Sequence, residues 1–113
     1  MTQFNNNLTK ERWFDLSLLE QMANVGSEVH RIIAWKITDP GRSTRAADSA
    51  LELVDLTLED PRHKKTPAMV ELCRLRESLA DYFYGQNAYG SSDQSWEEYF
   101  YGFSYAVALK RGV

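Results

Sequence analysis

Residues 17–41, SLLEQMANVGSEVHRIIAWKITDPG, decide the fold because they contain a helix start, a helical apolar face and a stop. Ser17 and Glu20 fit a capping box, in which a hydroxyl and a carboxylate satisfy backbone N–H groups at a helix start. The run Asp39-Pro40-Gly41 predicts the helix end, since proline disfavours helical geometry in the preceding residue. Between these signals, apolar residues recur at helical spacing: Leu18, Met22, Val25, Val29, Ile32 and Ile33.

Three further helices are predicted on the C-terminal side, over residues 43–59, 67–84 and 93–110. Asp60-Pro61 stops the first of them. Thr66-Pro67 begins the next with a cap followed by proline at the first helical position, where no N–H is needed. Gly85 closes that helix, and a polar link leads into the last one.

The links between the predicted helices are short, and no strand-like alternation or internal repeat of useful length is present. Short links favour antiparallel packing of consecutive helices. We therefore predict an all-α fold, an up-down antiparallel four-helix bundle. Residues 17–113 form its single domain, as suits a chain of 113 residues. Residues 1–16 form a polar N-terminal segment, of which Thr2 to Asn7 is expected to be frayed.

Composition limits the class of protein. The chain is 43% hydrophobic and 26% charged, which is ordinary for a globular domain. Its formal net charge of −3 argues against a general binder of polyanions. Cys73 is the one cysteine, so an intrachain disulfide is excluded, and no Cys/His pattern suggests zinc. No run of 18 apolar residues and no secretory start is present, so we expect a cytoplasmic protein without a membrane span.

The last predicted helix carries large rings on two opposite faces. One face holds Trp96, Tyr99, Phe100 and Phe103, whereas Tyr101 and Tyr105 point the other way. A surface helix normally has a single apolar stripe, so a second apolar neighbour is indicated, such as another copy of the chain.

Trp35 similarly lies off the main stripe of the first helix. Trp35, Tyr101 and Tyr105 are therefore the predicted oligomer interface. The alternative is that each ring lies flat on its own bundle with its polar tip in water.

An up-down bundle would bring the N-terminus, the second link and the C-terminus to one end. Seven of the 13 Lys plus Arg residues would gather there: Lys10, Arg12, Arg62, Lys64, Lys65, Lys110 and Arg111. This basic end could contact nucleic acid or an acidic partner, and such a contact would be salt-sensitive. The alternative is a structural role, because nearby acids dilute the patch and cations suit a helix C-terminus.

A ribbon of carboxylates, Asp48, Glu52, Asp55 and Glu59, follows one side of the second helix. We interpret it as a solvated face directed away from the bundle interior. The alternative is a Mg²⁺ site of the kind found in all-helical nucleotide pyrophosphohydrolases, formed with Glu77 and Asp81 of the next helix.

The sequence contains no clear catalytic constellation. His30 and His63 lie at no metal-pairing interval, and Cys73 has no histidine near it in sequence. Arg76 lies near the edge of the inward face of its helix and needs a carboxylate partner that the sequence does not identify. We predict no catalytic residue, metal or cofactor.

Four stretches together resemble a family of small, mostly uncharacterised bacterial helical proteins: residues 21–29, 50–57 and 76–83, and Trp96 with Tyr99-Phe100. Some members are associated with diversity-generating retroelement reverse transcriptases. The resemblance implies a four-helix bundle that assembles as a ring-like homopentamer and binds the reverse transcriptase and nucleic acid. The accessory protein of those systems is strongly basic, whereas this chain is acidic. That departure affects nucleic-acid binding more than the bundle.

The function predicted from the sequence is a non-enzymatic accessory or scaffold protein that self-associates through the outer faces of its first and fourth helices. Its most specific form is the accessory subunit of a retroelement reverse transcriptase, with RNA or DNA as a further partner. The enzyme alternative is a Mg²⁺-dependent nucleotide hydrolase that uses Glu52, Asp55, Glu77 and Asp81.

Overall fold

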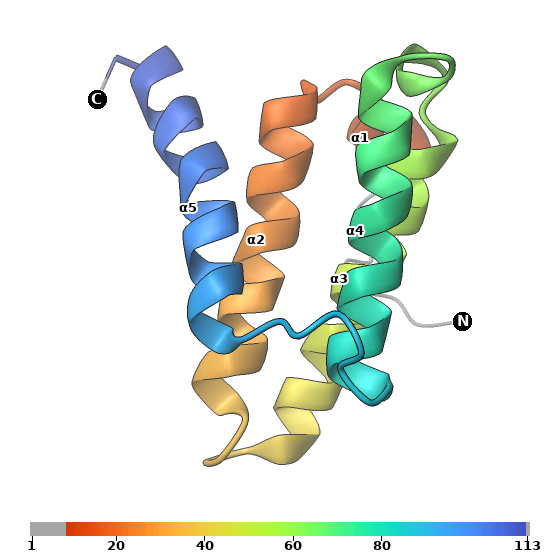
Figure 1. Ribbon diagram of the computed structural model, residues 1–113. Coiled ribbons are helices and arrows are strands. Elements are labelled where there is room, and N and C mark those ends of the chain that lie inside the picture. Colours follow the sequence, from red (N-terminus) through yellow and green to blue (C-terminus); the bar gives the residue numbers. More distant parts are fainter. Residues whose placement is uncertain (1–8, 113) are drawn as a thin grey trace.

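The computed structural model describes residues 9–112, so the predicted frayed head lies outside the described residues. Its long helices are α2 (Leu18–Trp35), α3 (Pro40–Glu59), α4 (Pro67–Tyr84) and α5 (Asp93–Lys110). A short helix, α1 (Lys10–Phe14), precedes them, and a 3₁₀ turn, η1 (Pro61–His63), joins α3 to α4. Consecutive long helices run in opposite directions, and no strand occurs over residues 9–112 (Figure 1). The predicted all-α, up-down four-helix bundle is confirmed.

The capping box that opens α2 forms as predicted. The Ser17 hydroxyl accepts the Glu20 N–H at 3.1 Å, and the Ser17 N–H donates to the Glu20 carboxylate at 3.0 Å. The predicted role of Asp39-Pro40-Gly41 is wrong, because this run begins α3 rather than ending α2. Asp39 is the N-cap and accepts the Arg42 N–H at 3.2 Å, while Pro40 occupies the first turn, where its missing N–H costs nothing.

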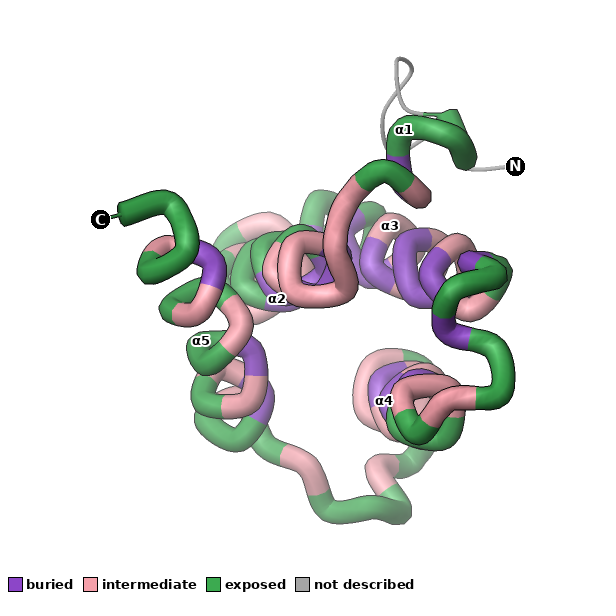
Figure 2. Tube along the Cα trace, turned by 90° about the horizontal axis from the view of Figure 1, so that it is seen from above, coloured by how far each residue is buried: buried purple, intermediate pink, exposed green. Residues whose placement is uncertain are grey.

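The core lies between the four long helices. α2 packs against α3 and α5, and α3 packs against α4. Figure 2 shows buried residues on the sides of the helices that face one another. The buried apolar side chains of these helices include Met22, Val25, Val29, Ile32, Ala46, Ala47, Ala50, Leu53, Val54, Leu72, Leu75, Leu79, Trp96 and Phe100. Each large one stabilises the fold by about 1.5–3 kcal/mol.

Helices α4 and α5 meet mainly through large side chains. The rings of Tyr82 and Trp96 lie 6.3 Å apart between centroids, and the Tyr99 hydroxyl donates to Glu71 at 2.7 Å. The inner rings of α5 therefore fill the seam that closes the bundle. None of the described helices is long and apolar enough to span a bilayer.

Helix α1 was not predicted, and it falls within the segment assigned as polar. Trp13 of this helix is 2% exposed, and its indole N–H donates to the Thr57 hydroxyl of α3 at 3.1 Å. Gln21 of α2 donates its amide N–H to the Trp13 carbonyl at 3.1 Å. One ring and two hydrogen bonds thus fasten α1 to the bundle.

Candidate functional site

The outer face of α5 carries three large exposed side chains in register. Tyr101, Tyr105 and Leu109 follow one another at intervals of four residues, and they are 67%, 54% and 56% exposed. We call these three residues the outer stripe. The opposite face of α5 holds Trp96 and Phe100, which are buried. The division of this helix into two ring-bearing faces is confirmed.

The two tyrosines of the outer stripe form a flat platform. Their ring centroids are 6.0 Å apart and their planes differ by 18°, so the rings stack on one another. Gly102 lies beside them, and a Cβ at that position would meet no atom within 4 Å. Tyrosine offers a large contact area with few rotatable bonds, which favours protein–protein contact.

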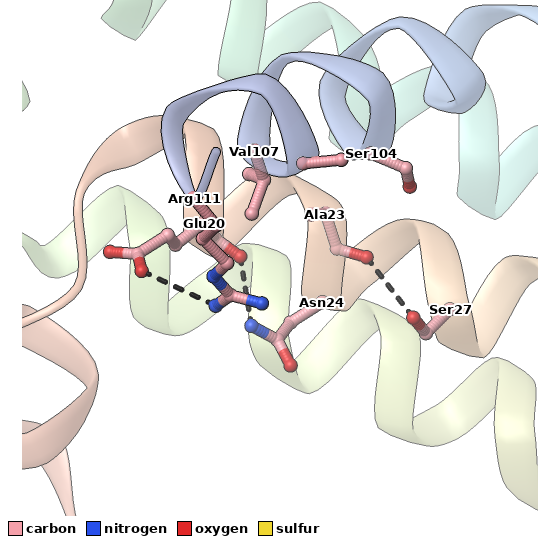
Figure 3. Close-up of a pocket in the computed structure, with 8 residues that line it drawn as sticks. Glu20, Ala23, Asn24, Ser27, Ser104, Val107 and Arg111 are labelled. Atoms are coloured by element: carbon pink, nitrogen blue, oxygen red, sulfur yellow. Dashed lines mark hydrogen bonds and ion pairs between the residues drawn. The ribbon is translucent and has the colours of Figure 1, made fainter. Parts of the chain in front are cut away.

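A shallow groove runs beside the outer stripe between α2 and α5 (Figure 3). It consists of two hollows of about 340 and 350 Å³, both lined by Ser27 and Ser104, so the groove is continuous. Small residues such as Ala23 and Ala108 line it, and Tyr101 forms part of one wall. We call this the α2–α5 groove.

Polar side chains bridge both ends of the α2–α5 groove. Arg111 forms an ion pair with Glu20 at 3.6 Å at one end, and His30 Nδ1 lies 3.1 Å from the Glu97 carboxylate at the other. Gly26 permits the close packing of the two helices, because a Cβ there would lie 2.8 Å from the Cβ of Phe100. The groove is therefore lined by small side chains, several of them polar, has charged residues at its ends, and lies beside the apolar outer stripe.

Trp35 does not join the outer stripe. It is half-buried and lines a separate groove with residues of α3, where the Arg42 guanidinium lies 5.3 Å from its ring centroid. This cation–π contact covers one ring face. The structure thus brings Tyr101 and Tyr105 together but leaves Trp35 apart from them.

The elements that carry the predicted basic end do lie together. The start of α1, the η1 turn and the end of α5 all lie at the same end of the bundle (Figure 1). Several of its cations are nevertheless paired: Lys10 with Glu59 at 2.7 Å, and Arg111 with Glu20. Arg12 lies exposed on α1. The pairing reduces the positive charge that a polyanion would meet.

Arg62 is held by Asp60 in a buried polar cluster at this end. Its guanidinium donates to the Asp60 carboxylate at 2.6 Å and to the Leu16 carbonyl at 2.6 Å. Asp60 is fully buried and also accepts from the Gln21 amide at 3.0 Å. These bonds, Arg62 first, hold the pKa of Asp60 well below its usual range despite burial. Arg62 thus has a structural partner.

The same cluster contains a histidine that the sequence left unexplained. His63 is 6% exposed, and its Nε2 lies 2.8 Å from the Gln21 side-chain oxygen. Thr57, fully buried, donates to the Leu53 carbonyl while accepting from Trp13. We call Thr57, Asp60, Arg62, His63 and Gln21 the Asp60 cluster. It joins α2, α3, η1 and α1.

Three predicted contact residues stay available for a partner. Lys64, Lys65 and Lys110 are exposed, and no ion pair joins them to another residue within 9–112. Lys65 has a φ of 60°, a left-handed turn conformation that closes η1 before α4 begins. These lysines form the accessible part of the basic end.

The predicted orientation of the carboxylate ribbon is wrong for the members that contact α4, whereas Glu59 is exposed as predicted. Asp48, Glu52 and Asp55 face α4 rather than solvent alone. The Arg76 guanidinium donates to Asp55 at 3.1 Å, and the Tyr84 hydroxyl donates to Asp48. The ribbon thus follows the α3–α4 seam, where α4 supplies donors that the sequence of α3 alone does not reveal. Asp55 is thus the carboxylate partner that Arg76 needs.

Glu52 lies half-buried in this seam. Desolvation raises the pKa of its carboxyl, and its Oε1 is buried without a hydrogen-bond partner among the described residues. Glu59, the fourth member of the predicted ribbon, is exposed and pairs with Lys10.

The four carboxylates of the hydrolase alternative do not converge. Asp81 accepts the backbone N–H groups of Ala88 and Tyr89 at 2.9 and 3.1 Å, and Glu77 accepts the Tyr89 hydroxyl at 3.2 Å. These two acids thus hold the link after α4. Over residues 9–112, no three His, Cys, Asp or Glu side chains are grouped as a metal ion would require.

Comparison of this chain with protein-family models, curated proteins and solved structures finds no match.

Proposed function

We propose that this protein is a non-enzymatic helical-bundle scaffold that self-associates through the outer stripe of α5. The observation that carries the proposal is the alignment of Tyr101, Tyr105 and Leu109, all more than half exposed, on one helix face. Contiguous exposed apolar surface rimmed by polar residues is typical of interaction sites. The other large exposed apolar side chains within 9–112 form no such row: Val70 and Tyr84 lie at opposite ends of α4, and Ile37 and Tyr89 lie in the links before α3 and α5.

The contact proposed here covers less of the molecule than the interface expected from the sequence. Helix α2 contributes no large exposed apolar side chain among the described residues, and its side of the surface is the small-residue wall of the α2–α5 groove. Trp35 faces a different groove. We therefore assign the contact to α5, with α2 as its flank.

Size-exclusion chromatography with light scattering tests the proposal. The wild-type protein should have a mass above the 13.0 kDa of one chain. Tyr101→Glu with Tyr105→Glu should return the mass to that of one chain, because two charges would have to be desolvated at the contact. Circular dichroism should show unchanged helicity.

Val70→Glu on α4 is the matched control. Val70 is 56% exposed, the same as Leu109, but lies on another helix. Val70→Glu should leave the mass unchanged, whereas Leu109→Glu should reduce it. A wild-type protein of 13.0 kDa at high concentration would contradict the proposal.

We propose, as the finer version of this function, an accessory subunit of a retroelement reverse transcriptase. The resemblance of the four sequence stretches supports it. Lys64 and Lys65 follow η1 and Lys110 ends α5, and these two elements lie at the same end of the bundle (Figure 1). These lysines would contact the enzyme or nucleic acid, and counterion release would make the contact salt-dependent.

Fluorescence anisotropy with short labelled RNA and single-stranded DNA tests this version at low salt. Lys64→Glu with Lys65→Glu should weaken binding and reduce its salt dependence. Arg45→Glu with Arg74→Glu, which changes the net charge equally on exposed positions of α3 and α4, should have a smaller effect. Absence of binding to either probe at low salt would exclude direct nucleic-acid contact.

The hydrolase alternative gains no support from the positions of its carboxylates, which are divided between the α3–α4 seam and the link after α4. Metal-dependent hydrolysis of nucleoside triphosphates by the purified protein, lost in Glu52→Ala with Asp55→Ala, would restore it and contradict the scaffold.

A further inference from the structure

We infer that a groove between α2 and α3 binds a small aromatic phosphate of the size of a nucleoside monophosphate. The inference goes beyond the proposed function and concerns a different surface. It follows from the three arginines and one tryptophan that line this groove, from their spacing and from the size of the groove. We call it the arginine groove.

Each wall of the arginine groove is one side of a helix. Its charged, hydroxyl and aromatic residues follow intervals of three and four on both walls: Glu28, Arg31 and Trp35 on α2, and Arg42, Arg45 and Ser49 on α3. Residues so spaced share a helix face. Trp35 ends α2 and Arg42 lies in the first turn of α3, so these two lie at the end of the groove next to the α2–α3 link.

The lining of the arginine groove is positive in a chain whose net charge is −3. It holds three guanidinium groups and one carboxylate, that of Glu28. Arg45 is exposed and has no ion pair within the described part of the chain. Arg31 pairs with Glu28 at 3.0 Å and Arg42 with Asp39 at 3.5 Å. Both arginines are exposed in these pairs, which contribute little and leave most guanidinium N–H donors for a ligand.

The choice of cation favours a phosphate group. The planar guanidinium of arginine donates two parallel hydrogen bonds to a phosphate, whereas lysine acts as a point charge. All three cations of the lining are arginines. A phosphate monoester carries between one and two negative charges at neutral pH, which matches the lining's excess of three cations over one anion.

Trp35 provides a surface for a flat ring beside these cations. Its half-buried indole lines the groove, and the Arg42 guanidinium lies 5.3 Å from its ring centroid. This cation–π contact orders the Arg42 side chain before a ligand binds. Nucleobases stack both on aromatic rings and on guanidinium planes, so the pair offers a place for a base.

The size of the groove suits one nucleotide unit. Its volume is about 350 Å³, which lies within the range of small-molecule sites. Its α2 wall, from Glu28 to Trp35, is about 10 Å long at a rise of 1.5 Å per residue. With a base beside Trp35, the phosphate would reach Arg31, one helical turn away, and Arg45 on the opposite wall.

The arginine groove is separate from the other two surfaces described above. The α2–α3 link lies at the end of the bundle opposite to the basic end, and no residue of α5 lines this groove (Figure 1). A ligand there would contact neither the outer stripe nor the accessible lysines. Binding of the ligand and self-association can therefore be tested independently.

An NMR titration with adenosine monophosphate (AMP) at low salt tests the inference. Trp13 and Trp96 are buried, so the indole N–H signal of Trp35 should shift selectively. The dissociation constant should be below about 1 mM. Adenosine and inorganic phosphate should each bind more weakly, because each has only one of the two groups. An unchanged Trp35 signal, or inorganic phosphate that binds as tightly as AMP, would overturn the inference.

Arg45→Ala tests the phosphate contact. It should raise the dissociation constant of AMP by about tenfold or more, because a charge-assisted contact is lost. Arg74→Ala is the matched control, since Arg74 of α4 is also exposed and without an ion pair in the described part of the chain. The control should bind AMP as the wild type does. Equal losses in the two variants would indicate only general attraction and overturn the inference.

Trp35→Leu tests the ring contact and excludes a merely structural effect. It should weaken AMP binding and leave the affinity for inorganic phosphate unchanged, whereas equal loss of both would overturn the role of Trp35. Tyr101→Glu with Tyr105→Glu should bind AMP normally, and loss of binding in this variant would overturn the assigned location. A short single-stranded oligonucleotide that shifts the Trp35 signal at lower concentration than AMP would overturn the assignment to a free ligand.

Discussion

The Asp60 cluster and the outer stripe both depart from the usual distribution of residues, in opposite directions. The first buries polar side chains, and the second exposes apolar ones. Asp60 and Gln21 are fully buried, yet each is hydrogen-bonded within the chain. Tyr101 and Tyr105 touch each other but remain more than half exposed. Buried polar groups that are hydrogen-bonded within the chain have a structural role. Exposed apolar rings that the chain itself does not cover indicate a partner.

The largest expected effect on stability comes from removing the carboxylate at the centre of the Asp60 cluster. Asp60→Ala should lower the free energy of unfolding by about 3 kcal/mol, because Gln21 and Arg62 lose a buried acceptor. Urea denaturation at neutral pH measures the change. Glu59→Ala is the matched control, since its ion pair with Lys10 is exposed and screened by solvent, so its loss should change stability much less. Equal losses in the two variants would remove the contrast.

Lowering the pH should reduce the stabilisation of the fold by the same cluster. Because Arg62 and Gln21 depress the folded-state pKa of Asp60, its stabilisation is complete above the unfolded-state value of about 3.9 and is lost as pH falls below it. Between about pH 5 and pH 2, the wild type should lose about 1–2 kcal/mol more than Asp60→Asn. Denaturation curves at several pH values test this. A parallel decline in both proteins would mean that Asp60 has no part in acid sensitivity.

A smaller loss should follow when the link between α1 and the cluster is cut. Trp13→Phe keeps a buried ring but removes the N–H that donates to Thr57. One net hydrogen bond stabilises the fold by about 1 kcal/mol. Hydrogen exchange should accelerate in residues 10–14 before it does in α3. Exchange that rises uniformly over the bundle would show that α1 does not open locally.

The smallest effect on folding is expected at the outer stripe. Tyr101→Ser with Tyr105→Ser should change the unfolding free energy of the isolated chain by less than about 0.5 kcal/mol, since exposed positions contribute little. The measurement uses dilute protein, at which light scattering shows a single chain. A loss above about 1 kcal/mol would mean that the rings support their own bundle, which would restore the alternative considered from the sequence.

Local geometry explains what the sequence could predict. The capping box at Ser17 and Glu20, the apolar period of α2 and the two faces of α5 depend on residues within a few turns of one another. The rotation of about 100° per residue therefore placed Trp96 inside and Tyr101 outside correctly.

Long-range partners explain what the sequence could not predict. Asp60 and Gln21 are 39 residues apart, and Asp55 finds Arg76 across the α3–α4 seam. A ribbon of acids has the same pattern whether it faces water or a helix with donors, so its orientation was assigned wrongly. Helix α1 has five residues, too few for a period to be recognised.

Gly26 has a consequence for the evolution of this chain. The hydrogen at this position is what allows the Phe100 ring to sit against α2, since a methyl group would lie 2.8 Å from its Cβ. A relative with alanine at position 26 must therefore carry glycine at position 100 or separate the two helices, because every other residue keeps a Cβ at position 100. Positions 26 and 100 should therefore vary as a pair. A library randomised at both should recover a residue larger than glycine at position 26 only together with a change at position 100.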